Sequence, residues 1–465
     1  MLASNEQHAF DDDSVVSVTP QVGNHRPFIA LLVLFVLLAT SFSLLLPLGE
    51  SADEVSHFAL VRFIAEQKRA PLTQAEREAI GKKGDASPIY HGLVALTTQH
   101  TDISALPTLP VQSEPLRFIP YDAPRTNEVY HTADELFPFQ GIVLAWHLGR
   151  LISVPLGVLT LIGIYRTVLL IYPQRPYFAL AATAFAAFLP RFLMISGVLN
   201  DDNLVIPLVT FALYFLVRVI QGDQRRSTLI FLGVAIGLAT IVKYHGLILW
   251  LEVAAVLTIL AWRNQWTWRH TLTQLTWPII GFVAAAGWWF VILYTQFNQV
   301  AELGLIKGIL APLGDPVMVR SVDTILDENR IYWIEWAVPL FQSFWIVYGG
   351  TQLFAPPIIY QALTILSMVI GGGLIIWLYR NFKTNQWVIR WDMALLLFHG
   401  LVYLGIIIFR FQSEPTAVGA QGRHLLPALV SIAFFVVLGL SELYLRSGQT
   451  SPVARGDYAR SHPGS

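Results

Sequence analysis

Long apolar runs separated by short polar turns fill most of the chain. A helix of about 20 apolar residues, rising ~1.5 Å per residue, crosses the ~30 Å hydrocarbon layer of a bilayer. The pattern therefore predicts an all-α polytopic membrane protein that crosses the bilayer about ten times. The expected spans are residues 27–47, 141–172, 177–199, 204–221, 228–242, 246–262, 272–297, 357–379, 391–411 and 425–445.

Two segments of mixed polarity, 49–139 and 298–355, interrupt this pattern. Both are too long for ordinary connecting loops, so we expect them to be functional. The first should open with a surface helix directly after the first span. A second charged, amphipathic helix is expected over residues 73–83. In the second segment, residues 333–348 are apolar and aromatic but interrupted by polar residues, which indicates a re-entrant or interfacial piece.

The two ends of the chain are polar. Residues 1–25 and 446–465 are expected to be cytoplasmic tails, the first of them disordered. Residues 26–445 then form one transmembrane domain. The first apolar run is too long for a cleavable signal peptide, and no small-residue cleavage site follows it, so it is interpreted as a signal anchor. We find no internal repeat.

Composition agrees with a membrane protein and narrows the chemistry. Hydrophobic residues make up 54% of the chain and charged residues 13%, whereas soluble domains carry about 25% charged residues. The net charge of -1 gives no indication of a nucleic-acid partner. The chain has no cysteine, which excludes disulfides, thiol catalysis and cysteine-ligated zinc.

The distribution of lysine and arginine orients the chain, because cytoplasmic loops are enriched in these residues. With the N-terminus inside, the short outer turns carry only Lys243 and Arg423, with Arg410 at a span end. Both long segments then lie outside, together with the turn 200–203. The cytoplasmic ends carry Arg26, Arg175, Arg225, Arg226, Arg263, Arg269, Arg380, Lys383, Arg390 and Arg446.

Asp53, Glu54 and His57 stand where the chain leaves the first span. On a helix, their spacings of three and four place all three side chains on one face. Two carboxylates and a histidine at the membrane boundary could serve as a general base or as a metal site. The competing interpretation is that the carboxylates are helix N-terminal charges, worth ~0.3–1 kcal/mol, and that the histidine is an ordinary surface residue.

Further polar groups are expected on the same outer side. Asp201 and Asp202 would be base or metal ligands, although they would also suit an ordinary turn that caps a helix. Lys243 and Arg423 are candidates for binding phosphate, and the competing interpretation makes them snorkelling interface anchors. Tyr244 joins the candidates for binding phosphate, and Asn200, His57 and His424 join the candidates for binding the acceptor or a metal. His245 and Gln421 lie on the same side.

Charges inside the expected spans raise a separate question. Arg191 lies several residues from the outer end of the third span. Such a charge costs at least ~2.5–3.5 kcal/mol unless it is paired. We therefore expect a partner or a polar cavity, and Arg191 joins the candidates for binding phosphate. The same question applies to His147, Arg150 and Glu252.

A site that faces outward limits the possible donors. Cytosolic nucleotide sugars and ATP do not reach the outer leaflet, so an activated group must be carried there by a lipid. This favours a polyprenyl-phosphate-linked sugar, with its phosphate at the level of the headgroups and of the basic residues.

Several motifs, taken in order, resemble the GT-C superfamily of polytopic membrane glycosyltransferases, including its protein O-mannosyltransferase and lipid A aminoarabinose-transferase branches. The acidic pair and histidine after the first span are the first of these motifs. Each motif alone is weak, and their order across most of the chain is more specific. The others, similar to uncharacterised bacterial members, are HLGRLISVPLG (147–157), AFLPRF (187–192), SGVLNDDNL (196–204), GLATIVKY (237–244), SFW (343–345) and QGRHLLP (421–427).

The resemblance implies a GT-C-like fold and an inverting transfer of a sugar from a polyprenyl-phosphate lipid to an extracytoplasmic glycan, lipid or protein. It implies that Asp53 or Glu54 is the catalytic base. The turn with Asp201 and Asp202 would bind metal or acceptor, and Lys243 and Arg423 would meet the donor phosphate. The expected location is a bacterial plasma membrane. Whether a divalent metal ion is needed is left open.

One departure from the family pattern affects the first long segment. Family members often carry a Pro-Pro-Leu-Tyr-Tyr element before the second span. This chain has only Ser87-Pro-Ile-Tyr90 and Phe137-Pro-Phe139. The acceptor side of the site is therefore the least defined by the resemblance.

Two other classes of function are considered. A secondary transporter or lipid flippase would favour inverted repeats, broken mid-membrane helices and polar groups at the bilayer midplane, whereas the sequence shows no repeat and its polar groups gather at one face. A non-catalytic scaffold or sensor would use the first long segment as a binding module, and polyprenyl-phosphate lipids would not affect its stability. The sequence does not identify the sugar, the acceptor or the oligomeric state.

Overall fold

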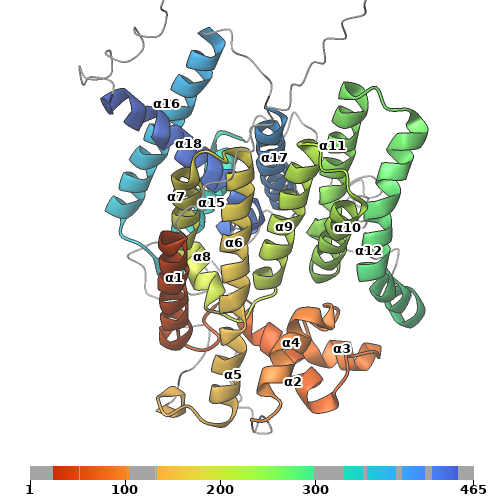
Figure 1. Ribbon diagram of the computed structural model, residues 1–465. Helices are drawn as coiled ribbons and strands as arrows, with labels where there is room; N and C mark the ends of the chain where they lie inside the picture. Colours follow the sequence, from red (N-terminus) through yellow and green to blue (C-terminus); the bar gives the residue numbers. More distant parts are fainter. Residues whose placement is uncertain are drawn as a thin grey trace, which may run out of the picture.

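The computed structural model describes residues 25–51, 53–101, 103, 131, 133–297, 329–348, 353–383, 390–413 and 421–448. This part of the chain is almost entirely helical (Figure 1). The strands within it are β1 (Val347–Tyr348) and β2 (Leu353–Phe354), which pair antiparallel. The predicted all-α class is confirmed. Residues 1–24 and 449–465 of the two polar tails and residues 104–130 of the first long segment lie outside the described residues.

Eight helices of the described residues are long and apolar enough to cross a membrane. The bent pair α7 and α8 makes a ninth, and α10 is shorter, at 17 residues. The polytopic class is confirmed, whereas the count of about ten is not. The helices are α1 (Arg26–Leu45), α5 (Gly141–Leu151) with α6 (Ser153–Ile171), α7 (Pro176–Ala187), α8 (Pro190–Ser196), α9 (Asp202–Ile220), α10 (Arg226–Val242), α11 (Leu249–Arg263), α12 (Trp268–Phe297), α16 (Pro357–Lys383), α17 (Trp391–Ser413) and α18 (Leu429–Gly448).

The third expected span, 177–199, is broken into two helices. Pro190 begins α8, and the axes of α7 and α8 differ by 68°. Proline has no N–H to donate and its ring clashes with the preceding helical turn, so a single straight helix cannot run through this position. The bend directs α8 into the protein, where Arg191 is buried.

Glycines bring α10 and α12 into backbone contact. A Cβ atom added at Gly233 would lie 1.9 Å from the Pro278 carbonyl oxygen, and one added at Gly281 would lie 2.1 Å from that of Ile230. Small residues allow this close packing between membrane helices. The packing fixes the C-terminal end of α10, where Lys243 is the cap residue.

The first long segment forms a small helical cap. Figure 1 shows α2 (Glu54–Gln67), α3 (Gln74–Ile80) and α4 (Pro88–Thr98) gathered at one end of the bundle beside α5. The charged helix expected over 73–83 is α3, which begins with a capping box between Thr73 and Glu76. The cap has its own apolar core, which includes Phe58, Tyr90 and Trp146.

Two short 3-10 helices and one further helix lie at the end of the bundle that carries the cap. η2 (Tyr244–Ile248) joins α10 to α11, and η5 (Gly422–Ala428) leads into α18. Helix α15 (Asn329–Trp345) packs against η5 and α8. The re-entrant or interfacial interpretation of residues 333–348 stays a prediction, because nothing in the fold sets their depth in a membrane.

Candidate active site

Glu54 is locked in a buried ion pair with Arg150. The Arg150 Nε and Nη2 atoms donate to the two carboxylate oxygens, each at 2.7 Å, and both side chains are fully buried. Arg150 also donates to the carbonyl oxygens of Ser43, Leu46 and Pro47. These contacts provide the partner that a charge in the second span requires, and they tie α5 to the end of α1.

The remaining capacity of the Glu54 carboxylate is used by backbone. The N–H groups of Gly49 and Leu199 donate to it at 3.1 Å and 3.0 Å. Glu54 therefore joins the end of the first span, α5 and the turn before α9. A carboxylate with four donors and no exposure is poorly placed to take a proton from a substrate. Of the two residues proposed as the base, the geometry favours Asp53.

Asp53 lies beside the first helix of the cap rather than within it. Helix α2 begins at Glu54, and Asp53 is its N-cap residue with a left-handed backbone at φ 65°. Aspartate is among the residues that tolerate this conformation. The single helical face expected for Asp53, Glu54 and His57 is thus incorrect for Asp53. The left-handed turn directs its carboxylate to residues from elsewhere in the chain.

The Asp53 carboxylate is held by two cations. Arg423 Nη2 donates to Asp53 Oδ2 at 2.9 Å, across 370 residues of sequence. Lys82 Nζ forms an ion pair with Oδ1. Burial alone would raise the pKa of Asp53, but Arg423, Lys82 and Lys83 outweigh burial and hold the pKa well below its ordinary value. The side chain remains 15% exposed, so Asp53 is an accessible anion.

The turn before α9 carries a second carboxylate cluster. Lys243 Nζ lies 2.8 Å from Asp201 Oδ1 and also pairs with Asp202, while Lys83 Nζ lies 3.2 Å from Asp201 Oδ2. Burial would raise the pKa of Asp201, but Lys243 and Lys83 keep the pKa far below its usual range. Burial likewise opposes the charge of Lys243, and Asp201 and Asp202 raise its pKa.

Hydrogen bonds fix the shape of this turn. The Asn200 N–H donates to the Tyr90 hydroxyl at 3.0 Å, which ties the turn to α4. Asn203 Nδ2 donates to the carbonyl oxygens of Ile195, Val198 and Asn200. Asp201 is the N-cap residue of α9 but makes no side-chain cap bond. The helix-capping interpretation of Asp201 is therefore incorrect.

Two buried histidines face Asp201. His91 Nδ1 lies 3.2 Å from the Ser87 carbonyl oxygen, so it carries the proton and leaves His91 Nε2 as an acceptor. His57 Nδ1 lies 2.9 Å from that atom and must donate to it. The lone pair of His57 Nε2 is then directed at Asp201 Oδ1, 3.8 Å away. Asp201 Oδ1 already has Lys243 Nζ at 2.8 Å, whereas His57 Nε2 has no hydrogen-bond partner among the described residues, so a cation or a water is needed to satisfy this nitrogen.

The protonation states agree with this arrangement. Burial holds the pKa of His57 well below its ordinary value, and burial lowers the pKa of His91 to about 4. Both rings are therefore neutral at pH 7. The lone pair of His57 Nε2 is free, whereas the lone pair of His91 Nε2 accepts the His57 proton and can bind an ion only if that hydrogen bond opens. The ligand atoms of His57, His91 and Asp201 all lie within 4.8 Å of one another.

The other predicted site residues have their own contacts. Arg191 Nη1 donates to the Val347 carbonyl oxygen at 2.8 Å, which supplies the expected partner. Tyr244 is oriented toward the side of α12, where it packs with Trp289, and burial raises its pKa. His424 follows Arg423 on η5, and its N–H donates to the Gln421 carbonyl oxygen. The side chain of His245 lies outside the described set.

The structure thus brings together most of the groups that the sequence placed on the outer side. One line of alternating charges runs from Arg423 through Asp53 to Lys82, and a second runs from Lys83 through Asp201 to Lys243. The adjacent residues Lys82 and Lys83 join the two lines. Lys243 and Arg423 are thus ion-paired, so the interface-anchor interpretation is not supported. The roles of the individual residues stay predictions.

Sequence reasoning missed Lys82, Lys83 and His91 as parts of this site. The lysines follow an amphipathic surface helix, where such charges are ordinary. His91 stands 34 residues from His57 and shows no ligand spacing. A possible signal is the tyrosine and histidine pair at 90–91, because both are polar aromatic residues in an otherwise apolar helix.

Charges deeper in the bundle also have partners. His147 Nδ1 lies 3.2 Å from the Ser43 carbonyl oxygen. Glu252 Oε1 lies 2.8 Å from His399 Nδ1, and both side chains are fully buried. These contacts answer the question that the sequence raised for His147 and Glu252.

Residues 146–291, just under a third of the 465-residue chain, match the family model described as dolichyl-phosphate-mannose-protein mannosyltransferase. The match includes Arg150, the turn 200–203 and Lys243. The resemblance stated from the motifs is therefore confirmed over this segment. No protein of curated function matches the sequence.

Solved structures with a similar arrangement share little sequence with this chain. ArnT from Cupriavidus metallidurans bound to undecaprenyl phosphate is 14% identical, with a TM-score of 0.46, over 91% of this chain and 62% of that one. The Archaeoglobus fulgidus oligosaccharyltransferase tethered to an acceptor peptide is 14% identical, with a TM-score of 0.49, over 92% and 51%. AglB from Archaeoglobus fulgidus, in complex with an inhibitory peptide and a dolichol-phosphate, is 16% identical, with a TM-score of 0.44, over 91% and 52%. The chain spans between about half and three fifths of the length of these proteins.

Proposed function

We propose that this protein is a membrane glycosyltransferase of the GT-C type that takes a sugar from a polyprenyl-phosphate lipid. The family match over residues 146–291 supports this assignment. The observation that carries it is the contact between Asp53 and Arg423. An accessible carboxylate beside several cations, at the end of a bundle of apolar helices, combines a proton acceptor with a site for a lipid phosphate.

In the proposed reaction the basic residues receive the donor phosphate. Arg423, Lys82 and Lys243 now pair with carboxylates. A phosphate group would share these cations, because charge-assisted bonds to phosphate are strong. As Arg423 and Lys82 turn toward the phosphate, the pKa of Asp53 would rise from its depressed value and the carboxylate would become a stronger base.

The chemical step then uses Asp53 as a general base. The carboxylate takes the proton of the acceptor hydroxyl, and the oxygen attacks the anomeric carbon of the sugar. The bond from that carbon to the phosphate oxygen breaks, and its electron pair leaves with the lipid phosphate. Attack opposite the leaving group inverts the configuration. General base catalysis of this kind contributes roughly 10²–10⁴-fold, and the cations stabilise the charge that develops on the phosphate.

The proposed location is a bacterial plasma membrane with the active site on the outer side. The distribution of lysine and arginine supports this orientation. Arg175, Arg225 and Arg263 flank the ends of α7, α10 and α11, and the ends opposite to these carry the cap and the candidate site. A lipid carrier can present its sugar on that side without cytosolic nucleotides.

His57, His91 and Asp201 would fit a divalent metal ion as a cofactor once the hydrogen bond from His57 Nδ1 to His91 Nε2 opens. Two neutral imidazoles and one carboxylate are a common ligand set for zinc and other first-row ions. A bound ion would use the lone pair of His57 Nε2, which has no hydrogen-bond partner among the described residues and faces Asp201 Oδ1 at 3.8 Å. Its chemistry there would be to add positive charge beside the donor phosphate.

The proposed function is tested by deleting the gene in its own host and comparing envelope glycans and glycolipids by mass spectrometry. The deletion should remove a mass increment of one sugar from a defined glycan or glycolipid, and the intact gene should restore it. The same transfer should proceed in proteoliposomes that contain the purified protein and the polyprenyl-phosphate sugar. Unchanged glycans and glycolipids in the deletion strain would contradict the proposal.

A further inference from the structure

The 3-10 helix η5, which carries Arg423, is held by contacts from outside itself. It runs for 7 residues, Gly422–Ala428, whereas 3-10 hydrogen bonds have poor geometry and runs longer than about four residues are uncommon. Pro427 lies inside it and has no N–H to donate. The position of Arg423 opposite Asp53 therefore depends on the helices that surround η5.

Ser343 on α15 supports the beginning of η5. Its hydroxyl oxygen accepts a hydrogen bond from the Gly422 N–H at 2.8 Å, and its O–H donates to the Pro339 carbonyl oxygen. The Ser343 side chain is fully buried. A Cβ atom added at Gly422 would lie 2.1 Å from the Phe344 backbone nitrogen, so the backbones of η5 and α15 are in contact. The residue before Arg423 is thereby fixed from one side.

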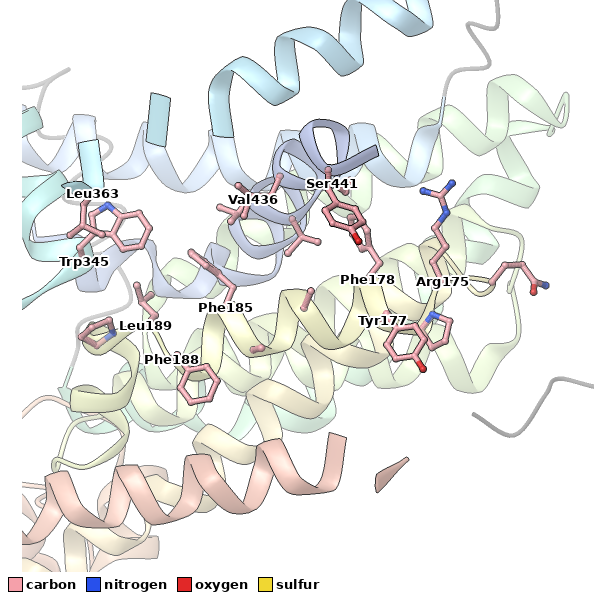
Figure 2. A pocket seen from close by; sticks show the side chains of 18 residues that line it. Arg175, Tyr177, Phe178, Phe185, Phe188, Leu189, Trp345, Leu363, Val436 and Ser441 are labelled. Atoms are coloured by element: carbon pink, nitrogen blue, oxygen red, sulfur yellow. The ribbon is translucent and has the colours of Figure 1, made fainter. Parts of the chain in front are cut away.

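Helix α15 is in turn anchored in the bundle. Figure 2 shows Trp345, two residues after Ser343, in the wall of an apolar groove between α7, α16 and α18. The Trp345 ring meets the Phe185 ring of α7 edge to face, with the centroids 5.9 Å apart, and only 8% of Trp345 is exposed. Aromatic pairs of this kind favour a specific geometry. The end of α15 that carries Ser343 therefore has a fixed position against α7.

His399 on α17 supports the other end of η5. Its Nε2 atom lies 3.3 Å from the Pro427 carbonyl oxygen, and its Nδ1 atom lies 2.8 Å from Glu252 Oε1. A carbonyl oxygen only accepts hydrogen bonds, so Nε2 carries a proton. One further proton lies between Nδ1 and Oε1, and the pair of Glu252 and His399 is neutral as a whole whichever of the two atoms holds it.

The same pair joins the two segments that carry cations of the candidate site. Glu252 lies in the first turn of α11, directly after η2, which follows Lys243. His399 reaches from Glu252 to η5, which carries Arg423. Both Glu252 and His399 are fully buried, and apolar side chains of similar volume often stabilise a fold at least as well as a buried pair. A role in fixing η5 therefore explains the pair better than stability does.

We propose that Ser343 and His399 are positioning residues, which clamp η5 at its two ends so that Arg423 faces Asp53. Both act through Arg423 rather than through contact with a substrate. The inference deepens the proposed function, on which its consequence for donor binding rests. Without the clamp, Arg423 would spend part of its time away from Asp53, and its contact with the donor phosphate would weaken as well.

The clamp is tested by a double-mutant cycle that needs no lipid substrate. The cycle compares the unfolding equilibrium constants, in mixed detergent micelles, of the unmodified protein, Asp53→Asn, Arg423→Gln and the double variant. The coupling between Asp53 and Arg423 should be about tenfold in the unfolding equilibrium constant. In a Ser343→Ala or a His399→Asn background the coupling should fall below about twofold. An unchanged coupling in either background would overturn the role of that residue.

Two control backgrounds separate positioning from a general loss of stability. Glu252→Gln keeps both hydrogen bonds, because its amide can donate to His399 Nδ1 while Nε2 still donates to Pro427, so the coupling should persist. Leu257→Ala opens a cavity on α11, at a side chain that is 4% exposed, and lowers stability without removing any of these hydrogen bonds. The coupling should persist there too. If Leu257→Ala reduced the coupling as much as Ser343→Ala does, the proposal would fail.

Binding of undecaprenyl phosphate separates this proposal from the proposed function. Ser343→Ala should weaken binding by roughly three- to tenfold, up to the loss of one charge-assisted contact, and should have no further effect in an Arg423→Gln background. If the unmodified protein binds no undecaprenyl phosphate, the proposed function fails, and the double-mutant cycle still decides the clamp. If Ser343→Ala weakens binding equally in both backgrounds, Ser343 does not act through Arg423. Ser343→Ala removes a single oxygen atom, so the test stands even if His399→Asn does not fold.

Discussion

Arg423 and Asp53 are in contact at 2.9 Å although 370 residues separate them in the sequence. The contact joins the residue that opens the first outer cap to the 3-10 helix before the last membrane helix. Glu54, the next residue after Asp53, pairs instead with Arg150 in a fully buried site. Adjacent carboxylates therefore have different environments. The Asp53 side chain remains 15% exposed and is held by Arg423 and Lys82, whereas Glu54 is fixed in the fold.

Breaking the Glu54 pair should lower stability. Glu54→Gln leaves the Arg150 guanidinium buried without its counter-charge, which typically costs about 3–5 kcal/mol. Thermal unfolding in detergent should show a clearly lower Tm. The control is Glu66→Gln, which breaks an exposed i,i+4 pair with Arg62 and should change Tm little. An equal Tm for the two variants would mean that the buried pair is not structural.

Lys243 should contribute to binding of the donor. Lys243→Gln removes one of the cations proposed for the phosphate, so we expect KM for the polyprenyl-phosphate sugar to rise by about tenfold, a typical charge-assisted contribution. Lys383→Gln, at the other end of the membrane helices, is the matched control and should leave KM unchanged. If both variants kept the KM of the unmodified protein, Lys243 would not meet the donor.

Stability should fall in mild acid because of the two buried histidines. Their pKa values are lowered in the folded state, so below the ordinary value of about 6.5 the unfolded chain binds more protons. The free energy of unfolding should therefore decrease as pH falls from about 6.5 to the folded pKa of His91, about 4. Asp53 and Asp201 also have lowered pKa values. Their contribution to the free energy of unfolding is lost only when the pH falls below the ordinary aspartate pKa of 3.8.

A substitution can show which group titrates between pH 6.5 and 4. His91→Gln should flatten the decrease between pH 6.5 and 4 in pH-dependent unfolding. His131 has a raised pKa, and its contribution is lost as pH rises above about 6.5, so it acts outside the window. A His91→Gln variant with the same slope as the unmodified protein would show that other groups titrate there.

Metal binding can be tested without a transfer assay. If His57, His91 and Asp201 hold a divalent ion, Zn²⁺ should raise the Tm of the protein and appear in stoichiometric amount by elemental analysis. His57→Gln should abolish both effects. His100→Gln, on an exposed histidine outside the cluster, should keep them. If the protein retained no metal and its Tm did not rise with Zn²⁺, then Lys83 and Lys243 would be the cations of this site.

The sequence predicted the membrane helices and the gathering of polar residues at one end of them, but not the contacts of these residues. Apolar runs of bilayer length predict membrane helices directly, and the Thr73–Glu76 capping box marks α3 locally. The bend at Pro190 could have been expected, because proline interrupts a helix. The pairing of Asp53 with Arg423 could not, since it depends on how distant helices pack rather than on local spacing.

The choice between Asp53 and Glu54 shows the same limit. In the sequence both follow the first span and both could be a base. Only the tertiary structure reveals that Arg150, which looked like an unpaired charge in a membrane span, neutralises Glu54. Similarly, Lys82 and Lys83 resembled solvated surface charges until the cap was placed over the turn with Asp201.

The most direct test of the account compares Asp53→Asn with Asp85→Asn in the gene-deletion strain. Asp85 is also in the first cap and pairs with Arg77, but it is 67% exposed and lies outside the proposed base position. We predict that Asp53→Asn fails to restore the missing sugar, with transfer reduced by roughly 10²–10⁴-fold, while the protein is produced and Asp85→Asn restores transfer. Full restoration by Asp53→Asn would contradict the assignment of Asp53 as the base.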